Sequence, residues 1–549
     1  MKQKNWIIFT VFTLTLLVLL GCNQTTESEP ESRTLAINNM TFELADTSDI
    51  TVHRFSLGTL DIEGRHEGNP AIIPAPLDGI IALPQTEEAV PLVVMLHGNT
   101  EVENINDRIY AGFDFLVEQL AAQGYAAMSI NIVVDYQFEM IINGQTITGE
   151  SIDHSWAYDL FNAHLDALSL ANEGGDTAHG IDLEGRLLLD QLHLIGHSRG
   201  GMIADHFYRK DRDAHLSRIQ SLIRVGTMAY VYDYPHNHPD VPTAILMSQF
   251  DGDVFNHSGQ VLFDQILNQS THTSLAQITY IKGGNHNFFN RAFTIDDRLD
   301  AADIDIWEQH QDSWLTRQQQ EDFFMRYVAA FLDVATNQTE PFSTFDPSEP
   351  QPATMFGYPV FSSTYVPTPT RLLIEQKEAT GSATAEDYVQ LWGTGSLFNH
   401  VLSDPGEDRL ELMALSWTDD DGSVVLTPSA HDFSGRDSLS LYVAINSAND
   451  LNTENESQGF SLVLTDSSGQ SQRLIIPRET PALLFHPGQT DPPNENLDFS
   501  TRRGHTLLSE LRIPLSYFNT LNLEEIATIT LQFDQTPSGA IMISDIVLK

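Results

Sequence analysis

The spacing of hydrophobic residues divides the chain into two parts. From about residue 34 to residue 331, short apolar runs alternate with amphipathic stretches that have helical spacing. This alternation is typical of a sheet covered by helices on both faces. We expect strands at 72–83, 91–96, 126–134, 191–195, 222–228, 243–248 and 277–281, and helices at 110–123, 156–170 and 318–335. The pattern predicts an α/β domain over residues 41–336 with a doubly wound, mostly parallel sheet.

The pattern changes beyond this region. Residues 337–370 are rich in Pro, Ser and Thr, which predicts a linker. Residues 371–549 contain short alternating strands at 438–445, 460–465, 473–476, 526–533 and 540–547, separated by turn residues. These features predict an all-β sandwich of the jelly-roll kind. Trp417 and Tyr442 are candidates either for stacking on a sugar ring or for the sandwich core, because alternation alone does not tell which face meets water.

The N-terminus has the features of an export signal. Lys2 and Lys4 precede an apolar run at 6–20, which ends in Leu-Leu-Gly-Cys at 19–22. The run is shorter than the roughly 20 apolar residues of a membrane-spanning helix. Cys22 is the only cysteine of the chain, which argues against a disulfide framework. The polar stretch that follows predicts a flexible tether over 23–40.

The Leu-Leu-Gly-Cys ending resembles a bacterial lipoprotein signal peptide, here residues 1–22. The resemblance implies that Cys22 is lipidated and anchors the protein to the membrane. Asn23 follows the cysteine, where an aspartate would imply retention in the inner membrane. We therefore expect an exported protein held by lipid on the bacterial cell envelope, at the outer membrane.

The charge balance is strongly acidic. The 549 residues include 28 Lys and Arg against 75 Asp and Glu, a net charge of −47. Such a field repels nucleic acid and anionic lipid, so neither is an expected partner. An acidic, well-solvated surface is typical of proteins from salty surroundings, and attraction of cationic substrates is the alternative interpretation.

A serine motif lies at the end of the predicted strand 191–195. Gly196-His197-Ser198-Arg199-Gly200 fits G-x-S-x-G, and Gly201 follows. A tight turn from strand to helix strains the backbone of the serine, so the positions two before and two after it must be small. The motif predicts that Ser198 is a nucleophile, with the helix N-terminus favouring developing negative charge.

This arrangement resembles the α/β-hydrolase superfamily, over about residues 50–333. The resemblance implies an acid after a later strand and a histidine beyond the last one, in the order Ser, Asp, His. The acid falls on Asp251, with Ser248 where glycine is usual; Asp253 is the alternative, and Asp233 is a third candidate. The histidine is His286, in a glycine-containing loop at 282–289.

The implied mechanism is that of a serine esterase or lipase. His286 would act as general base, Asp251 would orient it, and Ser198 would form an acyl-enzyme that water releases. The backbone amides of Arg199 and Asn99 would form the oxyanion hole.

Three further signals bear on specificity. His97-Gly98-Asn99 also resembles the halide-binding turn of haloalkane dehalogenases, but those enzymes carry an aspartate where Ser198 stands. The Gly-His-Ser-Arg-Gly-Gly elbow is similar to that of chlorophyllases and secreted bacterial lipase-like proteins, although the elbow alone does not imply chlorophyll as substrate. His236 and His238 have metal-like spacing but no cysteine or carboxylate neighbours that would complete a site, so we expect neither a metal nor a cofactor.

The C-terminal strands, above all those at 511–548, resemble galactose-binding-like jelly rolls of carbohydrate-binding modules. The resemblance implies a possible carbohydrate ligand, and such folds often hold a structural calcium ion. The resulting hypothesis is an extracytoplasmic hydrolase of carboxylic esters, whose substrate could be a polymer or a lipid. Two rivals remain: a catalytically silent surface binding protein, and a peptidase or perhydrolase of the same fold.

Overall fold

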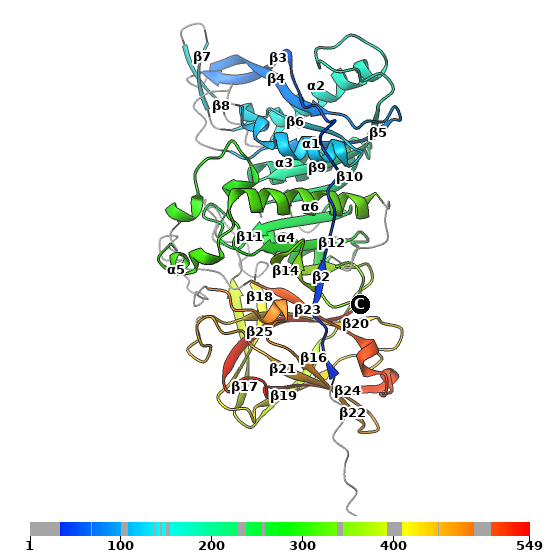
Figure 1. Ribbon diagram of the computed structural model, residues 1–549, viewed down its shortest axis with the longest axis vertical. Helices are drawn as coiled ribbons and strands as arrows, with labels where there is room; N and C mark the ends of the chain where they lie inside the picture. The colour runs from blue at the N-terminus through cyan, green and yellow to red at the C-terminus, as the bar shows by residue number, and fades with distance from the viewer. Residues whose placement is uncertain are drawn as a thin grey trace, which may run out of the picture.

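The computed structural model describes residues 33–66, 69–99, 108–136, 138–142, 145–149, 154–227, 238–254, 259–269, 271–301, 304–336, 344–391, 409–447, 449–487 and 507–549. The predicted signal peptide with Cys22, and most of the predicted tether, lie outside these residues. The described chain forms an α/β part and an all-β part, which are stacked along the long axis of the molecule (Figure 1).

The α/β part is built on a 13-stranded sheet of described strands, in the order β2-β13-β14-β12-β11-β10-β9-β5-β6-β4-β3-β8-β7. Its middle, from β12 to β6, is parallel, and it is flanked by β14 on one side and β4 on the other, both antiparallel. The strands are β2 (Asn38–Met40), β3 (His53–His66), β4 (Asn69–Ala82), β5 (Val90–Leu96), β6 (Ala126–Ile130), β7 (Phe138–Ile142), β8 (Gln145–Gly149), β9 (Leu187–His197), β10 (Ile219–Val225), β11 (Thr243–Ser248), β12 (Ala276–Ile281), β13 (Pro352–Met355) and β14 (Tyr358–Tyr365).

Helices cover both faces of this sheet, as the pattern predicts. Alternate residues of β5 face opposite layers: Val93 and Met95 belong to the core with α1 and α6, and Val94 belongs to the core with α2 and α3. The helices are α1 (Asp114–Ala122), α2 (Ser155–Asn172), α3 (Arg199–Asp213), α4 (Gly259–Asn268), α5 (Ile304–Trp307) and α6 (Arg317–Ala335). No described helix is long and apolar enough to span a bilayer.

The all-β part consists of two sheets that share one core. One sheet has the order β1-β22-β21-β24-β19-β16, and the other has the order β17-β18-β25-β20-β23, with β15 paired to β25. The strands are β1 (Arg33–Thr34), β15 (Thr370–Arg371), β16 (Ile374–Thr380), β17 (Ala383–Leu391), β18 (Arg409–Trp417), β19 (Ser423–Pro428), β20 (Ser438–Ile445), β21 (Phe460–Asp466), β22 (Ser471–Ile476), β23 (Ser509–Pro514), β24 (Ile526–Gln532) and β25 (Gly539–Leu548).

The predicted sugar-stacking aromatics belong to the interior. Trp417 is fully buried, and its ring stacks on that of Phe533 with 4.1 Å between centroids. Tyr442 is buried as well, and its hydroxyl donates to the backbone oxygen of Thr364. Trp417 therefore lies in the sandwich core, and Tyr442 lies in a buried cluster that the sandwich shares with the α/β part.

The predicted boundaries differ from the structure at two places. The segment expected to be a linker, 337–370, contains β13 and β14, and β14 pairs with β12 over residues 360–365 and with β13 over residues 358–359. Its small polar side chains can be buried because they find partners elsewhere: Thr364 bonds to the carboxylate of Glu510 through its amide and its hydroxyl. The segment expected to be a tether, 23–40, contains β1, which pairs with β22, and β2, which pairs with β13.

The two parts meet at a buried ionic cluster. Glu510 on β23 contacts Arg512 at 3.0 Å and the ammonium group of Lys549 at 2.5 Å, and all three side chains are buried. The same carboxylate accepts a hydrogen bond from Gln351, next to β13. The pKa of Glu510 is far below its usual value; burial opposes this shift, but Arg512 and Lys549 outweigh burial. The charged cluster therefore connects the sandwich to the α/β sheet.

Candidate active site

The sequence-predicted site residues gather at the carboxyl edge of the parallel strands. Asn99 follows β5, Ser198 follows β9, Asp251 follows β11 and His286 follows β12. In open α/β sheets, this edge is where ligands bind, because the loops after several parallel strands meet there.

Ser198 stands between β9 and α3 in a strained conformation, with φ 56° and ψ −125°. Its neighbours explain why the motif needs glycine. A Cβ atom on Gly196 would lie 2.2 Å from the backbone oxygen of Gly200, and one on Gly200 would lie 2.3 Å from that of Leu96. The turn therefore cannot form with larger residues at these two positions, which is the geometry that the G-x-S-x-G pattern predicts.

Asp251 lies beside His286. The Oδ2 atom of Asp251 accepts a hydrogen bond from Nδ1 of His286 at 2.9 Å, and both side chains are buried. The amide of Val254 donates to the other carboxylate oxygen at 2.6 Å, which fixes the orientation of the carboxylate. Ser248, at the position where glycine is usual, donates its hydroxyl to the backbone oxygen of Asn285 at 2.7 Å and so joins the two loops.

The alternative acid occupies a different place. The side chain of Asp253 is 55% exposed, and its Oδ2 atom lies 3.5 Å from Nε2 of His286, the nitrogen opposite the one that Asp251 contacts. Asp233 lies outside the described residues. Of the candidates that the structure describes, Asp251 is therefore the one placed to orient the imidazole.

Three carboxylates act on the pKa of His286. Burial lowers this pKa, but the charges of Asp251, Asp253 and Asp297, together with the hydrogen bond that His286 donates to Asp251, outweigh burial and raise it to about 10. The imidazolium form is thus strongly favoured in the free protein.

Strand β10 brings Ser198 and His286 to one place. The amide of Ser198 donates to the backbone oxygen of Val225 at 2.7 Å, at the end of this strand. A Cβ atom on the next residue, Gly226, would lie 2.9 Å from Nδ1 of His286. Nε2 of His286 is buried and makes no hydrogen bond within the described part of the chain. In proteins without substrate, catalytic hydrogen bonds are often long, so this geometry is compatible with a serine–histidine pair.

His197, the variable residue before the serine, supports the histidine loop. Its Nε2 donates to the backbone oxygen of His286 at 3.0 Å, and the two rings are 4.8 Å apart. Burial, with the nearby charge of His286, holds the pKa of His197 well below its usual value, so its ring is neutral. The sequence motif leaves this position open, and only the fold reveals its contact.

The loop after β5 passes directly against the serine. A Cβ atom on Gly98 would lie 2.8 Å from Cβ of Ser198, and Asn99 follows, with its Oδ1 atom buried and unpartnered among the described residues. His97 fixes this loop: its Nδ1 donates to the backbone oxygen of Gly98 at 2.8 Å, and its Nε2 accepts from the amide of Ile132 at 3.0 Å. Burial lowers the pKa of His97 to about 4, in keeping with a neutral ring. The amide of Asn99 is thus near Ser198, and Arg199 opens α3 beside it.

Of the two histidines with metal-like spacing, the structure describes one. His238 is buried and accepts from the guanidinium of Arg224 at 3.3 Å, and His236 lies outside the described residues. Within the described ranges, no three His, Cys, Asp or Glu side chains are grouped as metal ligands would be.

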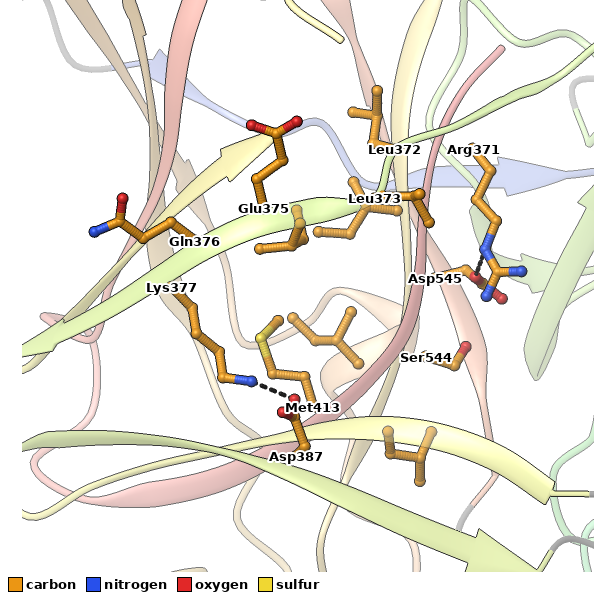
Figure 2. A pocket seen from close by; sticks show the side chains of 14 residues that line it. Arg371, Leu372, Leu373, Glu375, Gln376, Lys377, Asp387, Met413, Ser544 and Asp545 are labelled. Atoms are coloured by element: carbon orange, nitrogen blue, oxygen red, sulfur yellow. Dashed lines mark hydrogen bonds and ion pairs between the residues drawn. The ribbon is translucent and has the colours of Figure 1, made fainter. Parts of the chain in front are cut away.

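The sandwich has a cavity of about 490 Å³ between β16, β17, β18 and β25, which Figure 2 shows. Two ion pairs stand at its sides, Lys377 with Asp387 and Arg371 with Asp545. The described residues that line it include aliphatic side chains but no aromatic ring: Arg371, Leu372, Leu373, Ile374, Glu375, Gln376, Lys377, Asp387, Leu412, Met413, Ile543, Ser544, Asp545 and Ile546.

Comparisons with known proteins add little to the description of this site. No protein-family model matches the chain, and no curated protein is similar to it. Among solved structures, a ferulic acid esterase from Streptomyces cinnamoneus matches at a TM-score of 0.32 and 15% identity, over 55% of this chain and 93% of the other. A structure from an analysis of two fungal esterases from Rhizomucor miehei matches at a TM-score of 0.31 and 11% identity, over 54% and 87%. These similarities are too low to carry an argument, so the function must be inferred from the site itself.

Proposed function

We propose that this protein is a serine hydrolase that cleaves carboxylic esters through Ser198, His286 and Asp251. One observation carries the proposal: a strained serine at a strand-to-helix turn shares one sheet edge with a buried histidine–carboxylate pair. This is the constellation of an α/β-hydrolase, in which an activated serine forms an acyl-enzyme.

In the proposed mechanism, each of these groups has one role. His286, once deprotonated, accepts the proton of Ser198 through Nε2, while Asp251 holds Nδ1 and stabilises the imidazolium that forms. Ser198 attacks the ester carbonyl, and the negative charge develops near the amides of Asn99 and Arg199 at the N-terminus of α3. The protonated His286 then donates to the leaving alcohol, and the reverse sequence with water releases the acid.

An ester panel tests the proposal. The full exported chain, from residue 23 onward, is assayed in high salt and at alkaline pH against p-nitrophenyl esters of rising acyl length. A Ser198→Ala variant serves as the control. We expect turnover by the wild type and none above background by the variant, and the best chain length separates an esterase from a lipase. Folded wild-type protein that hydrolyses no ester would refute the proposal.

The proposed location is the outer membrane, through a lipid on Cys22. The support is the signal-like sequence at 1–22 and the single cysteine that ends it. Replacement of Cys22 with Ser should release the protein from the membrane fraction of a bacterial host, and continued sedimentation with membranes would contradict the anchor. A carbohydrate ligand of the sandwich stays a prediction, because Trp417 and Tyr442 are buried.

A further inference from the structure

A third carboxylate, Asp297, lies behind the candidate catalytic pair. It begins a short 3-10 turn (Asp297–Asp300) and is almost completely buried. No motif marks this position in the sequence. Its side chain accepts three backbone hydrogen bonds: Oδ2 from the amides of Gly252 at 2.8 Å and His286 at 3.0 Å, and Oδ1 from that of Asn287 at 2.9 Å.

These bonds join the loop that carries the acid to the loop that carries the histidine. Gly252 directly follows Asp251, so one oxygen of Asp297 is shared between the neighbour of the acid and the histidine itself. A Cβ atom on Gly252 would lie 2.2 Å from the backbone oxygen of Asp297, so the acid loop and the segment around Asp297 are in close contact here. This contact explains why glycine separates the two aspartates of the Asp-Gly-Asp sequence.

The segment around Asp297 is itself held firmly. Asp296 accepts from the side-chain amide of Asn285 at 2.9 Å and forms an ion pair with Arg298 at 2.7 Å. Arg298, also buried, donates to the backbone oxygen of Gly283 at 2.8 Å. The segment therefore contacts the histidine loop from Gly283 to Asn287 and gives Asp297 a fixed position.

We propose that Asp297 is a positioning residue that holds the acid loop and the histidine loop at the spacing that the Asp251–His286 pair needs. This inference rests on the proposed function. A carboxylate suits the role because its two oxygens accept several amides at once, whereas a neutral side chain has fewer acceptors. Burial raises the pKa of Asp297, and the nearby charge of Asp251 raises it further. Burying the charged carboxylate of Asp297 therefore costs folding free energy. This cost favours a functional reason for an aspartate at this position.

Asp297 also contributes to the charge around His286. The titratable groups that face this imidazole are Asp251, Asp253, Asp297 and the neutral His197. Removal of the charge of Asp297 should lower the pKa of His286, so that the base becomes available at lower pH. A carboxylate that lay far from the imidazole and served folding alone would not produce this shift.

The test compares Asp297→Asn and Asp297→Ala with Asp312→Asn, which removes one exposed carboxylate of the same sign. Asparagine keeps one carbonyl oxygen for Gly252 and His286, but its NH2 group faces the amide of Asn287. Each variant is assayed for kcat and KM on a p-nitrophenyl ester across pH, and its folding is checked by thermal unfolding. Because loss of alignment of about 1 Å costs roughly 100-fold in rate, we expect a fall in kcat of about 100-fold for alanine and about tenfold for asparagine, with KM little changed.

The asparagine variant decides the question, since it is the one expected to fold. The inference requires a lower kcat at the optimum together with an acid limb of the pH profile moved to lower pH, while Asp312→Asn behaves as the wild type. Folded Asp297→Asn protein that lacks either effect overturns the inference and leaves the esterase proposal intact. A wild type without activity on any ester overturns both.

Discussion

Replacement of Gly226 with alanine should lower catalysis far more than it lowers stability. Gly226 has φ 52°, and an added Cβ atom would lie 2.9 Å from Nδ1 and 3.1 Å from Cε1 of His286. It would also lie 3.5 Å from Oδ2 of Asp251, which is an ordinary contact distance. The new methyl group therefore presses on the imidazole and leaves the carboxylate nearly untouched.

The size of the effect follows from these distances. Normal contact begins near 3.4 Å, so the ring must move away from Cβ by about 0.5 Å. A misplacement of about 1 Å costs roughly 100-fold in rate, so a displacement of about 0.5 Å predicts a fall in kcat of about tenfold. The left-handed backbone adds about 1–2 kcal/mol of strain, which in a chain of this size lowers the melting temperature by about 1–3 °C.

Gly185→Ala is the matched control. Gly185 has φ 69° with nothing within 4 Å of an added Cβ atom, and it precedes β9 at the end opposite Ser198. It should show a similar loss of melting temperature and an unchanged kcat on a p-nitrophenyl ester. If kcat of Gly226→Ala stays within a factor of about two of that of Gly185→Ala, the argument from the position of His286 is wrong.

Three other predictions concern the charged groups. First, kcat/KM of the wild type should rise with pH well into the alkaline range, because the pKa of His286 is raised to about 10 and only the neutral imidazole accepts a proton. A pH–rate profile that reaches its plateau below neutral pH would contradict this prediction. Second, Asp251→Asn should lose about 10⁴-fold in kcat. Asp253→Asn should stay active, and the acid limb of its pH–rate profile should move to lower pH. If Asp253→Asn lost more activity than Asp251→Asn, Asp253 would be the acid. Third, Glu510→Gln should destabilise the protein by about 3 kcal/mol in denaturant titrations, because Arg512 and Lys549 stay buried without their counter-charge. The control Glu524→Gln removes an exposed carboxylate and should leave stability unchanged. Equal unfolding midpoints for the two variants would refute a stabilising role for the cluster.

Local patterns sufficed for much of the fold. The predicted strands at 243–248 and 438–445 match β11 and β20 residue for residue: the first has an apolar centre after Pro242, and the second begins with alternating serine and leucine and ends in an apolar run. By contrast, β16 (Ile374–Thr380) has the sequence IEQKEAT and is largely exposed, so it offers no apolar alternation. Strand β14 contains Ser362, Ser363 and Thr364 in a row, which gives no apolar pattern, and the buried Thr364 bonds to Glu510, far along the chain.

The same distinction applies to the site. The serine turn could be predicted because its requirement for small residues is confined to five consecutive positions. The placement of Asp251 rather than Asp253 against Nδ1 of His286 depends on the folded structure, since both aspartates occupy one loop. Asp297 and Gly226 could not be found from sequence, because each matters only through contacts with loops that are distant in the chain.

The short strand β1 has a consequence for how the protein folds. Arg33 pairs with Leu474 in the outer sheet of the sandwich, although about 440 residues separate them. Pairing of β1 with β22 therefore closes a very long loop, and such distant pairings form more slowly than local ones. The N-terminal strand can join the sandwich only once the segment that carries β22 is in place.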